Sequence, residues 1–385
     1  MKTILIFLTG LITTSGYCQI DGSEPNNFPE IRIYISKNQL SNLRHNQNKL
    51  ILSHPTLIVN HDTANVKEIH TRGKTTLQFK RKSFSVELDK SITIHQSGKK
   101  IHVKKFNLLN LSMDKNLWRN RWSFLCMDQF GLFPLFNSFC KIWINDEPQG
   151  IYLIVEKPQQ LQGRLQSPYM LRRGLNHNVE DEYFNKNEKE LAKKYKKQFQ
   201  SIYSSDFSRP PDSLAARLHR IINLDMYFQF LAFNYLIMNG DYSDEVFFYI
   251  EPTKNWFEIV PWDYDDILRP IPHEGRSERN LEFTKHKLFS LEESMDRTIA
   301  GNKTLYEQYE KVLKALLFSL DAAQLESASY KVLRELEQLS EDDSMANTSL
   351  FLDVHPFDIQ QAKEDILISL DYILKRREWI LSQLK

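Results

Sequence analysis

Apolar and polar residues alternate in the first part of the chain, and apolar residues recur at helical spacing later. The alternation in residues 31–35 predicts a first strand. After residue 304, apolar positions three and four apart predict helices that include 306–320 and 359–384. The pattern therefore predicts an α+β protein, β-rich before about residue 160 and mainly helical after about residue 210. Further strands are expected over residues 57–60, 66–71, 77–88, 106–109, 139–144 and 151–155.

The alternation of apolar and polar residues changes phase within the strand expected over residues 77–88. Its apolar residues stand at odd positions up to Phe79 and at even positions from Phe84 onward, which predicts a bulge near residues 80–82. Counting back from Phe84 places Lys82 and Lys80 on the covered face, where a lysine needs an anion or a cleft. The alternative is an edge-strand lysine whose stem reaches water.

A run that is apolar on almost every face follows in the second half. Residues 224–238 predict a helix buried all round, and Gly240 is expected to end it in the left-handed conformation. Residues 245–251 and 256–260 then predict a β-hairpin joined by a turn at 252–255.

Two acidic loops flank this hairpin. Asp241 precedes its first strand and Asp263 follows its second, so both carboxylates are expected at the same end of the hairpin. Such a pair can hold a divalent cation and orient a hydroxyl beside it. The order of catalytic-loop aspartate, short hairpin and metal-binding aspartate is also that of a protein-kinase active site. The alternative is that both aspartates only cap turns.

Composition narrows the choice of function. The 385 residues are 41% apolar, which is enough for one two-lobed domain or two small ones. Fifty basic and forty-nine acidic residues leave a net charge of +1, so no global field favours nucleic acid or an anionic membrane as partner. Twelve glycines disfavour glycine-rich repeats and doubly wound dinucleotide-binding folds.

The N-terminus has the pattern of an export signal. Lys2 precedes an apolar run over 4–12 and then small and polar residues, which predicts a signal peptide over 1–19. The run is too short to span a bilayer, and no later run is long enough. The mature chain is therefore expected to be periplasmic, secreted or cell-surface. Cys18 leaves a lipid-modified N-terminus as a minor alternative, against which the bulky Tyr17 argues.

Three further features complete the chain. Cys126 and Cys140 can pair in an oxidising compartment, but their apolar surroundings favour two buried thiols. Residues 158–167 are expected to form a hinge between two lobes. Residues 185–197 are charged throughout, which predicts a solvated helix face or a mobile insertion.

Five stretches resemble the CotH kinase family, the exported atypical kinases named for spore-coat protein H. They are RGKTTLQFKRKSF (72–84), LLNLSMDKNLWRNRWSF (108–124), WINDEPQGIYLIVEK (143–157), MNGDYSDEVFFY (238–249) and IVPWDYDDIL (259–268). The last is the most specific, and the five follow one another in the family's order. The resemblance implies a two-lobed, atypical protein-kinase-like fold. Its β-rich N-lobe is expected over 28–160 and its helical C-lobe over 161–385.

The resemblance also implies roles for the charged residues. Asp241 corresponds to the catalytic-loop aspartate, which orients or deprotonates the acceptor hydroxyl and lies near the metal. Asp263 corresponds to the aspartate that holds Mg²⁺ against the phosphates of ATP. Lys82 is the candidate phosphate-contacting lysine.

The loop over the phosphates is implied in the same way. Gly73, Thr75 and Thr76 match the family's glycine and small hydroxyl residues, whose backbone N–H groups would face the phosphates. Trp262 is expected to border the nucleotide site, with a role as a packing aromatic as its alternative.

One position departs from the family. Five residues after the catalytic-loop aspartate the family generally has a metal-binding asparagine, whereas this chain has Val246. Asp244 or Glu245 could substitute with a displaced reach.

The implied function is an exported protein kinase that transfers the γ-phosphoryl group of ATP to Ser or Thr of secreted or surface proteins. The alternative is a weak or inactive pseudokinase that acts as a surface or assembly binding protein. A metal-dependent phosphoesterase is a third class, against which Lys82 and the lobed layout argue.

Overall fold

The computed structural model describes residues 28–96, 99–203, 211–269, 287–289, 293–346 and 357–384. The expected signal peptide and Cys18 lie outside these residues. Among the helices of the described part, none has the length and apolar character needed to cross a membrane.

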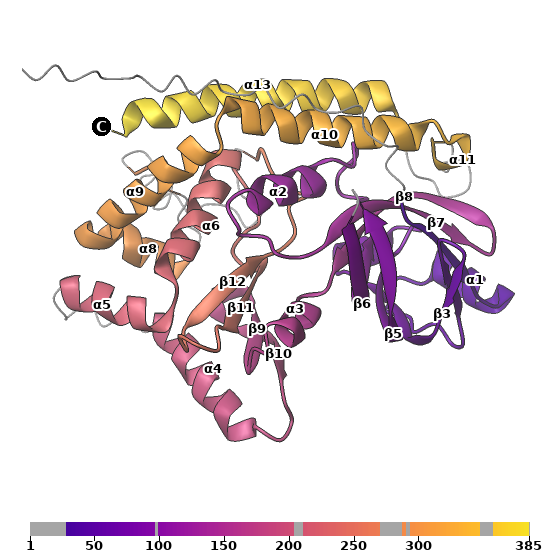
Figure 1. Cartoon of the computed structure of the whole chain (residues 1–385), viewed down its shortest axis with the longest axis horizontal. Coiled ribbons are helices and arrows are strands. Elements are labelled where there is room, and N and C mark those ends of the chain that lie inside the picture. Colours follow the sequence, from indigo (N-terminus) through magenta and orange to yellow (C-terminus); the bar gives the residue numbers. More distant parts are fainter. Residues whose placement is uncertain are drawn as a thin grey trace, which may run out of the picture.

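An eight-stranded sheet forms most of the N-terminal part (Figure 1). Its strand order is β3-β2-β1-β7-β8-β6-β5-β4, and all neighbouring pairs are antiparallel except β1 and β7. Helix α1 (Lys37–His45) follows β1 and begins after Ser36, which caps it. The strands are β1 (Glu30–Tyr34), β2 (Thr56–Val59), β3 (Asp62–Ala64), β4 (Val66–Arg72), β5 (Ser83–Gln96), β6 (Lys99–Leu109), β7 (Asn137–Ile144) and β8 (Glu147–Glu156).

A second sheet has the order β10-β9-β11-β12. Its strands are β9 (Tyr169–Arg173), β10 (Val179–Phe184), β11 (Val246–Ile250) and β12 (Phe257–Pro261). The expected hairpin is confirmed, because β11 pairs antiparallel with β12 and places Val246 opposite Pro261. The sequence pattern does not predict β9 and β10.

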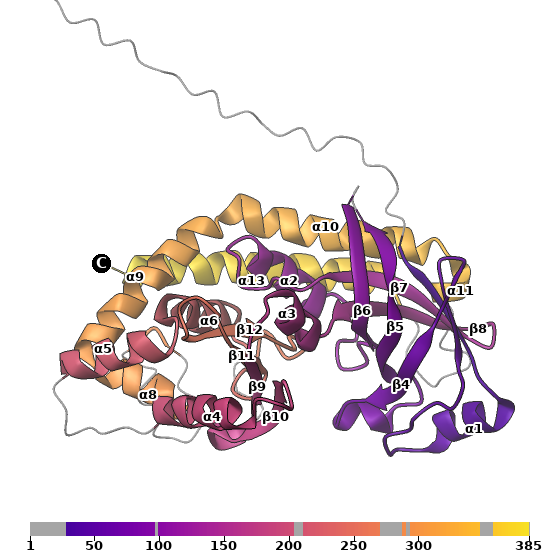
Figure 2. The same cartoon turned by 60° about the horizontal axis from the view of Figure 1, so that its bottom comes forward.

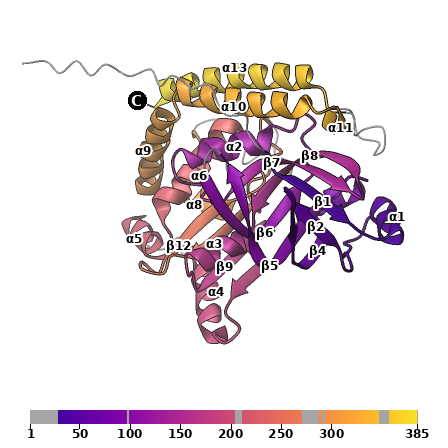
Figure 3. The ribbon, with the colours of Figure 1, turned by 45° about the vertical axis from the view of Figure 1, so that its right-hand side comes forward.

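Helices make up most of the remaining chain, and α6 (Leu224–Ile237) is buried among them, as its apolar run predicts. In Figures 1 and 3, α10 and α13 lie side by side, with α2 next to α10. Figure 2 shows α9 connecting this pair to α8 and α5 at the far end of the molecule. The other helices are α2 (Arg119–Asp128), α3 (Pro158–Arg164), α4 (Lys189–Tyr203), α5 (Pro211–Ile221), α8 (Ser294–Gly301), α9 (Lys303–Ser319), α10 (Ala322–Ser340), α11 (Asp343–Ala346) and α13 (Ile359–Gln383).

The large sheet lies between two hydrophobic cores. Along β7, Cys140 and Ile142 belong to the core of the N-terminal sheet, whereas Phe139 and Trp143 belong to the core shared with the helices. Because side chains of a strand alternate between its faces, β7 is covered on both sides. The architecture is the α+β fold that the sequence predicts, β-rich first and helical later. Cys126 and Cys140 are free buried thiols, which confirms the alternative that their apolar surroundings in the sequence favour.

The prediction of a strand over residues 77–88 is wrong for the first half of that range. A 3₁₀ turn occupies Thr75–Gln78, and β5 begins only at Ser83. The turn follows Gly73, whose φ of 109° and close approach to Thr76 suit only glycine, since an added Cβ would lie 1.8 Å from the Thr76 hydroxyl. The apparent phase change is therefore the end of a turn and not a bulge. Lys82 is buried as expected, but Lys80 is exposed.

The end of α6 also differs from the expectation. Met238, with φ of 49°, takes the left-handed position that Gly240 is expected to occupy. Gly240 serves another purpose, because Asp266 and Arg269 pack against its backbone so closely that a Cβ would lie 2.9 Å from Asp266 Oδ2. Its N–H donates to the Asp266 carbonyl at 2.9 Å. The glycine therefore admits the second acidic loop beside the first.

Two further segments contain helices, and the first confirms the helix alternative given for residues 185–197. The charged run at 185–197 largely forms α4, an amphipathic helix that buries Ala192, Tyr195, Phe199 and Ile202. The expected hinge at 158–167 contains helix α3.

Candidate functional site

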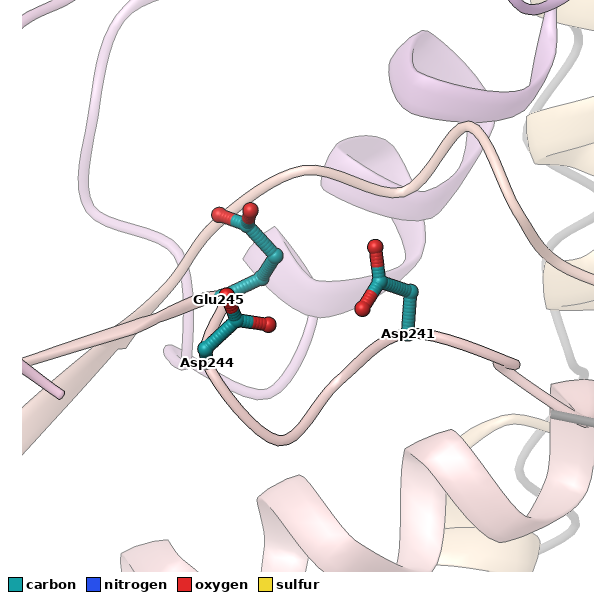
Figure 4. Close-up of side chains that lie close together, drawn as sticks. All are labelled: Asp241, Asp244 and Glu245. Carbon is teal, nitrogen blue, oxygen red and sulfur yellow. The ribbon is translucent and has the colours of Figure 1, made fainter. Parts of the chain in front are cut away.

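The loop between α6 and β11 gathers three carboxylates. One oxygen from each of Asp241, Asp244 and Glu245 lies within 4.8 Å of the others (Figure 4). Asn239, just after α6, shapes the loop by accepting a hydrogen bond from the Asp241 N–H at 3.0 Å. Two of these acids are the residues that the sequence offers as substitutes at the Val246 position.

The burial of these carboxylates indicates a missing partner. Asp244 Oδ1 and Glu245 Oε2 are buried, and neither accepts a hydrogen bond from the described part of the chain. Buried acceptors are almost always satisfied in folded proteins. Hard oxygen donors at this spacing suit a divalent cation such as Mg²⁺, so the residues fit the metal that the resemblance implies.

The loop after β12 brings further acids to the same place. Burial, followed by the charges of neighbouring acids, raises the pKa of both Glu245 and Asp265 well above the usual range. For each of them these neighbours include Asp241 and Asp263. The Gly240 N–H also donates to the Asp266 carbonyl at 2.9 Å, so Asp241 and Asp263 lie on adjacent loops. We call Asp241, Asp244, Glu245, Asp263 and Asp265 the acidic cluster.

Asn120 in α2 holds the second loop in position. Its amide nitrogen donates to Asp263 Oδ1 at 3.4 Å, and its oxygen accepts from the Tyr264 N–H at 2.7 Å. Asp263 itself has a positive φ of 48°, which costs energy for a residue with a Cβ. The two contacts from Asn120 bracket this strained position. Asn120 lies in one of the five family-like stretches, but the sequence assigns it no role.

Arg172 in β9 neutralises part of the acidic cluster. Its Nη2 lies 2.7 Å from Glu245 Oε1, and its Nε donates to the Asp244 carbonyl at 3.2 Å. On its other side, Nη1 lies 3.7 Å from Glu180. Sequence reasoning missed Arg172 because nothing in the local pattern predicts β9.

Lys82 does not reach the acidic cluster in this structure. Its ammonium donates to the Leu77 carbonyl at 2.5 Å, within the turn that precedes β5. Burial lowers the pKa of Lys82, and no carboxylate of the described residues opposes that shift. The nearby Thr76 hydroxyl donates to the Arg72 carbonyl at 3.4 Å, and Thr75 opens the 3₁₀ turn after Gly73.

Trp262 lies directly beside the acidic cluster. Its backbone N–H donates to the Glu245 carbonyl at 2.8 Å, which joins the two acidic loops. Its ring is buried and packs edge-to-face on Phe247, with 5.8 Å between ring centroids. The guanidinium carbon of Arg72 lies 5.9 Å from the centroid of the Trp262 ring. Arg72 is thus a basic residue that the N-terminal sheet brings to this place.

Comparison with known proteins identifies the family. A family model described as "CotH kinase protein" matches residues 69–380, which is most of the chain and includes all of the acidic cluster. The crystal structure of the Helicobacter pylori proinflammatory kinase CtkA is similar over 72% of this chain and 94% of that chain, with 10% identity and a TM-score of 0.30. That likeness is too weak to add to the family match. No curated protein sequence matches this chain.

Proposed function

The chain belongs to the CotH kinase family, and on that premise we propose that it is an exported protein kinase. It transfers the γ-phosphoryl group of ATP to serine or threonine hydroxyls of secreted or cell-surface proteins. The observation that carries the proposal is the meeting of Asp241 and Asp263 in one acidic cluster, with two carboxylate oxygens left without donors. Export rests on the signal-like segment at 1–19.

Each residue has a separate task in this proposal. Asp241 orients the acceptor hydroxyl and accepts its proton, while Asp244, Glu245 and Asp263 supply oxygen ligands. Bound Mg²⁺ supplies charge neutralisation of the transferred phosphoryl group. Asn120 keeps Asp263 aimed at the cluster. Most of the catalysis is positioning and electrostatic stabilisation.

Val246 bears on the choice between kinase and pseudokinase. It is fully buried at the start of β11 and offers no ligand atom. The two residues before it, however, carry the oxygens without donors. Those oxygens favour an active site in which the metal-binding side chain stands one or two residues earlier in the sequence than the family's asparagine. The missing asparagine itself is the observation that favours the second candidate, a pseudokinase that binds partners without transfer.

A labelled-ATP assay separates these candidates. The purified chain lacking residues 1–19 is incubated with Mg²⁺ and γ-labelled ATP, with denatured casein as generic acceptor. We expect label on serine or threonine with the wild type and none with Asp241→Asn. Asp263→Ala should also lose Mg²⁺-dependent ATP binding by calorimetry while remaining folded. Exposed Asp62 on β3 supplies the matched control, and Asp62→Asn should behave as wild type.

The remaining outcomes are distinct. Equal label with wild type and Asp241→Asn would remove the role given to Asp241. Binding of Mg·ATP without any label would select the pseudokinase. Export is tested by expressing the full chain and the 1–19 deletion in a bacterium and comparing periplasmic with cytoplasmic fractions. Equal distribution of the two would contradict export.

A further inference from the structure

Arg72 ends β4, the strand at one edge of the eight-stranded sheet. From this edge its side chain extends to the second sheet, where its guanidinium carbon lies 5.9 Å from the centroid of the Trp262 ring. Trp262 directly precedes Asp263. Arg72 therefore places a positive charge from the N-terminal part of the chain beside the residue expected to hold the metal.

The electrostatic surroundings of Arg72 are those of the acidic cluster. Burial lowers the pKa of its guanidinium, and the charges of Asp263, Glu245 and Asp265 oppose that shift. An arginine keeps its proton under such opposing effects. Arg72 is thus a permanent cation near the carboxylates expected to bind Mg²⁺.

The two arginines at the site differ in their hydrogen bonding. Arg172 donates hydrogen bonds to Glu245 and to the Asp244 carbonyl, and its Nη1 lies 3.7 Å from Glu180. The guanidinium of Arg72 makes no hydrogen bond or ion pair with the residues that the structure describes. A guanidinium has five N–H donors in a fixed fork that matches a phosphate or carboxylate. Arg72 therefore has donors available for an anionic ligand.

The backbone at Arg72 is held from both sides. On one side, β4 pairs with β5 and places Arg72 opposite Ser83. On the other, the Thr76 hydroxyl donates to the Arg72 carbonyl, and Lys74 lies 3.5 Å from Glu180 of β10. The turn after Gly73 is thereby joined to the second sheet, and the backbone from which the Arg72 side chain extends is held in place.

We propose that Arg72 contacts a phosphate of the nucleotide bound at the acidic cluster, and that Lys82 instead holds the turn before β5 through Leu77. A phosphate held at the acidic cluster would pair with the guanidinium fork of Arg72 in bidentate fashion. The inference rests on the proposed function, because it requires a nucleotide at this site.

Calorimetry with two probes tests the inference. Mg·ATP and Mg²⁺ alone are titrated into wild type, Arg72→Gln, Arg72→Lys and Lys82→Gln. We expect Arg72→Gln to weaken Mg·ATP binding by about 10- to 100-fold, the range for a charge-assisted bidentate pair. Binding of Mg²⁺ alone should stay the same or tighten, because a positive charge facing the metal ligands is gone. Arg72→Lys should recover part of the ATP affinity, and Lys82→Gln should retain it.

Arg32 provides the matched control. Its guanidinium carbon lies 4.4 Å from the centroid of the Trp143 ring, in the same sheet but away from the acidic cluster. Arg32→Gln therefore removes a similar arginine–tryptophan contact and should leave both titrations unchanged.

The outcomes separate this inference from the proposed function. If wild type does not bind Mg·ATP, the proposed function fails and the inference fails with it. If wild type binds but Arg72→Gln binds equally well, or Lys82→Gln alone loses affinity, only the inference is overturned. A loss of both Mg·ATP and Mg²⁺ binding in Arg72→Gln would show a structural role and also overturn it. If Arg72→Gln does not fold, Arg72→Lys decides: unchanged ATP affinity with the shorter, unforked cation would contradict bidentate contact.

Discussion

Tyr242 donates a hydrogen bond from its hydroxyl to Asp296 Oδ2 at 2.6 Å, and this contact ties the loop of the acidic cluster to helix α8. Tyr227 of α6 donates to the other oxygen of Asp296 at 3.1 Å. Arg173, fully buried, donates to the Tyr227 hydroxyl and to the Ser243 carbonyl. The loop that carries Asp241 therefore rests on a buried polar network made by three separate parts of the chain.

Tyr242→Phe tests this network. The change leaves Asp296 Oδ2 with one donor fewer in a buried position, and we expect a loss of about 1–3 kcal/mol in the free energy of unfolding. Phosphoryl transfer should also fall, because the loop loses an anchor next to Asp241. Urea denaturation and initial rates measure the two effects. Tyr249→Phe removes a hydroxyl bonded to the partly exposed Glu258 and serves as control. Equal losses in both variants would contradict a special role for the Tyr242 contact.

The stability of the fold should depend on pH through Asp296. Burial, opposed by Arg173 and by the bond from Tyr242, raises the pKa of Asp296 to about 6. The folded state then binds this proton more tightly than the unfolded state, whose aspartates titrate near pH 4. The contribution of this group is full below about pH 4 and is lost as pH rises to about 6, at up to about 1.4 kcal/mol per pH unit.

Asp296→Asn cannot ionise and should lack this part of the slope. Urea denaturation between about pH 4.5 and 7 measures the difference between wild type and variant. The exposed Asp225 in the first turn of α6 provides the control Asp225→Asn, which should keep the wild-type slope. A variant slope identical to that of wild type would show that Asp296 does not titrate in this window.

Mg²⁺ should stabilise the folded protein even without nucleotide. A ligand that binds only the folded state adds about 2.7 kcal/mol at one hundred times its dissociation constant. The melting temperature should therefore rise with Mg²⁺ and return after chelation. Asp244→Asn should abolish most of this rise, since Asp244 Oδ1 is one of the buried oxygens without a donor. A rise of equal size in that variant would place the cation elsewhere.

Val246→Asn should destabilise the fold without raising activity. Val246 is fully buried and pairs with Pro261 and Arg173 in the middle of the second sheet. An amide there loses apolar contact and needs hydrogen-bond partners, at a cost of about 1–3 kcal/mol. Because Asp244 and Glu245 already offer oxygens to the metal, the transfer rate at saturating Mg²⁺ should not increase. A clear gain in rate would show that the site lacks the family's asparagine as a ligand. Val246→Thr, similar in shape, separates the effect of polarity from that of the amide.

A buried ion pair should hold α2 against α10. Arg121 Nε and Nη2 lie 2.8 and 2.7 Å from the two carboxylate oxygens of Glu335, and both side chains are 4% exposed. Glu335→Gln leaves a buried guanidinium without its counter-charge and should cost about 3–5 kcal/mol in unfolding free energy. The double variant Arg121→Met with Glu335→Met should lose much less. A double variant as unstable as Glu335→Gln would assign the loss to packing instead.

Local pattern predicted several elements whose structure depends on neighbouring residues. The alternation at 31–35, the apolar run before residue 238 and the turn at 252–255 each depend on neighbours within a few residues, and β1, α6 and the β11–β12 hairpin follow them. The pattern failed at 77–82, where Gly73 starts a turn that Thr76 closes. A change of phase in the hydrophobic pattern can come from a bulge within a strand or from a turn before it. Sequence periodicity does not distinguish the two.

Sequence alone determined the α+β class, the hairpin between Asp241 and Asp263, and the five stretches by which the family is recognised. Each is a property of residue order, because periodicity and loop spacing are contained in the chain itself. Only the tertiary structure decided that Arg72 and Arg172 face the acidic cluster and that Lys82 bonds to Leu77. The position of the charged group of a long side chain depends on how strands far apart in the sequence pack together. That packing depends on the close-packed core of the whole molecule.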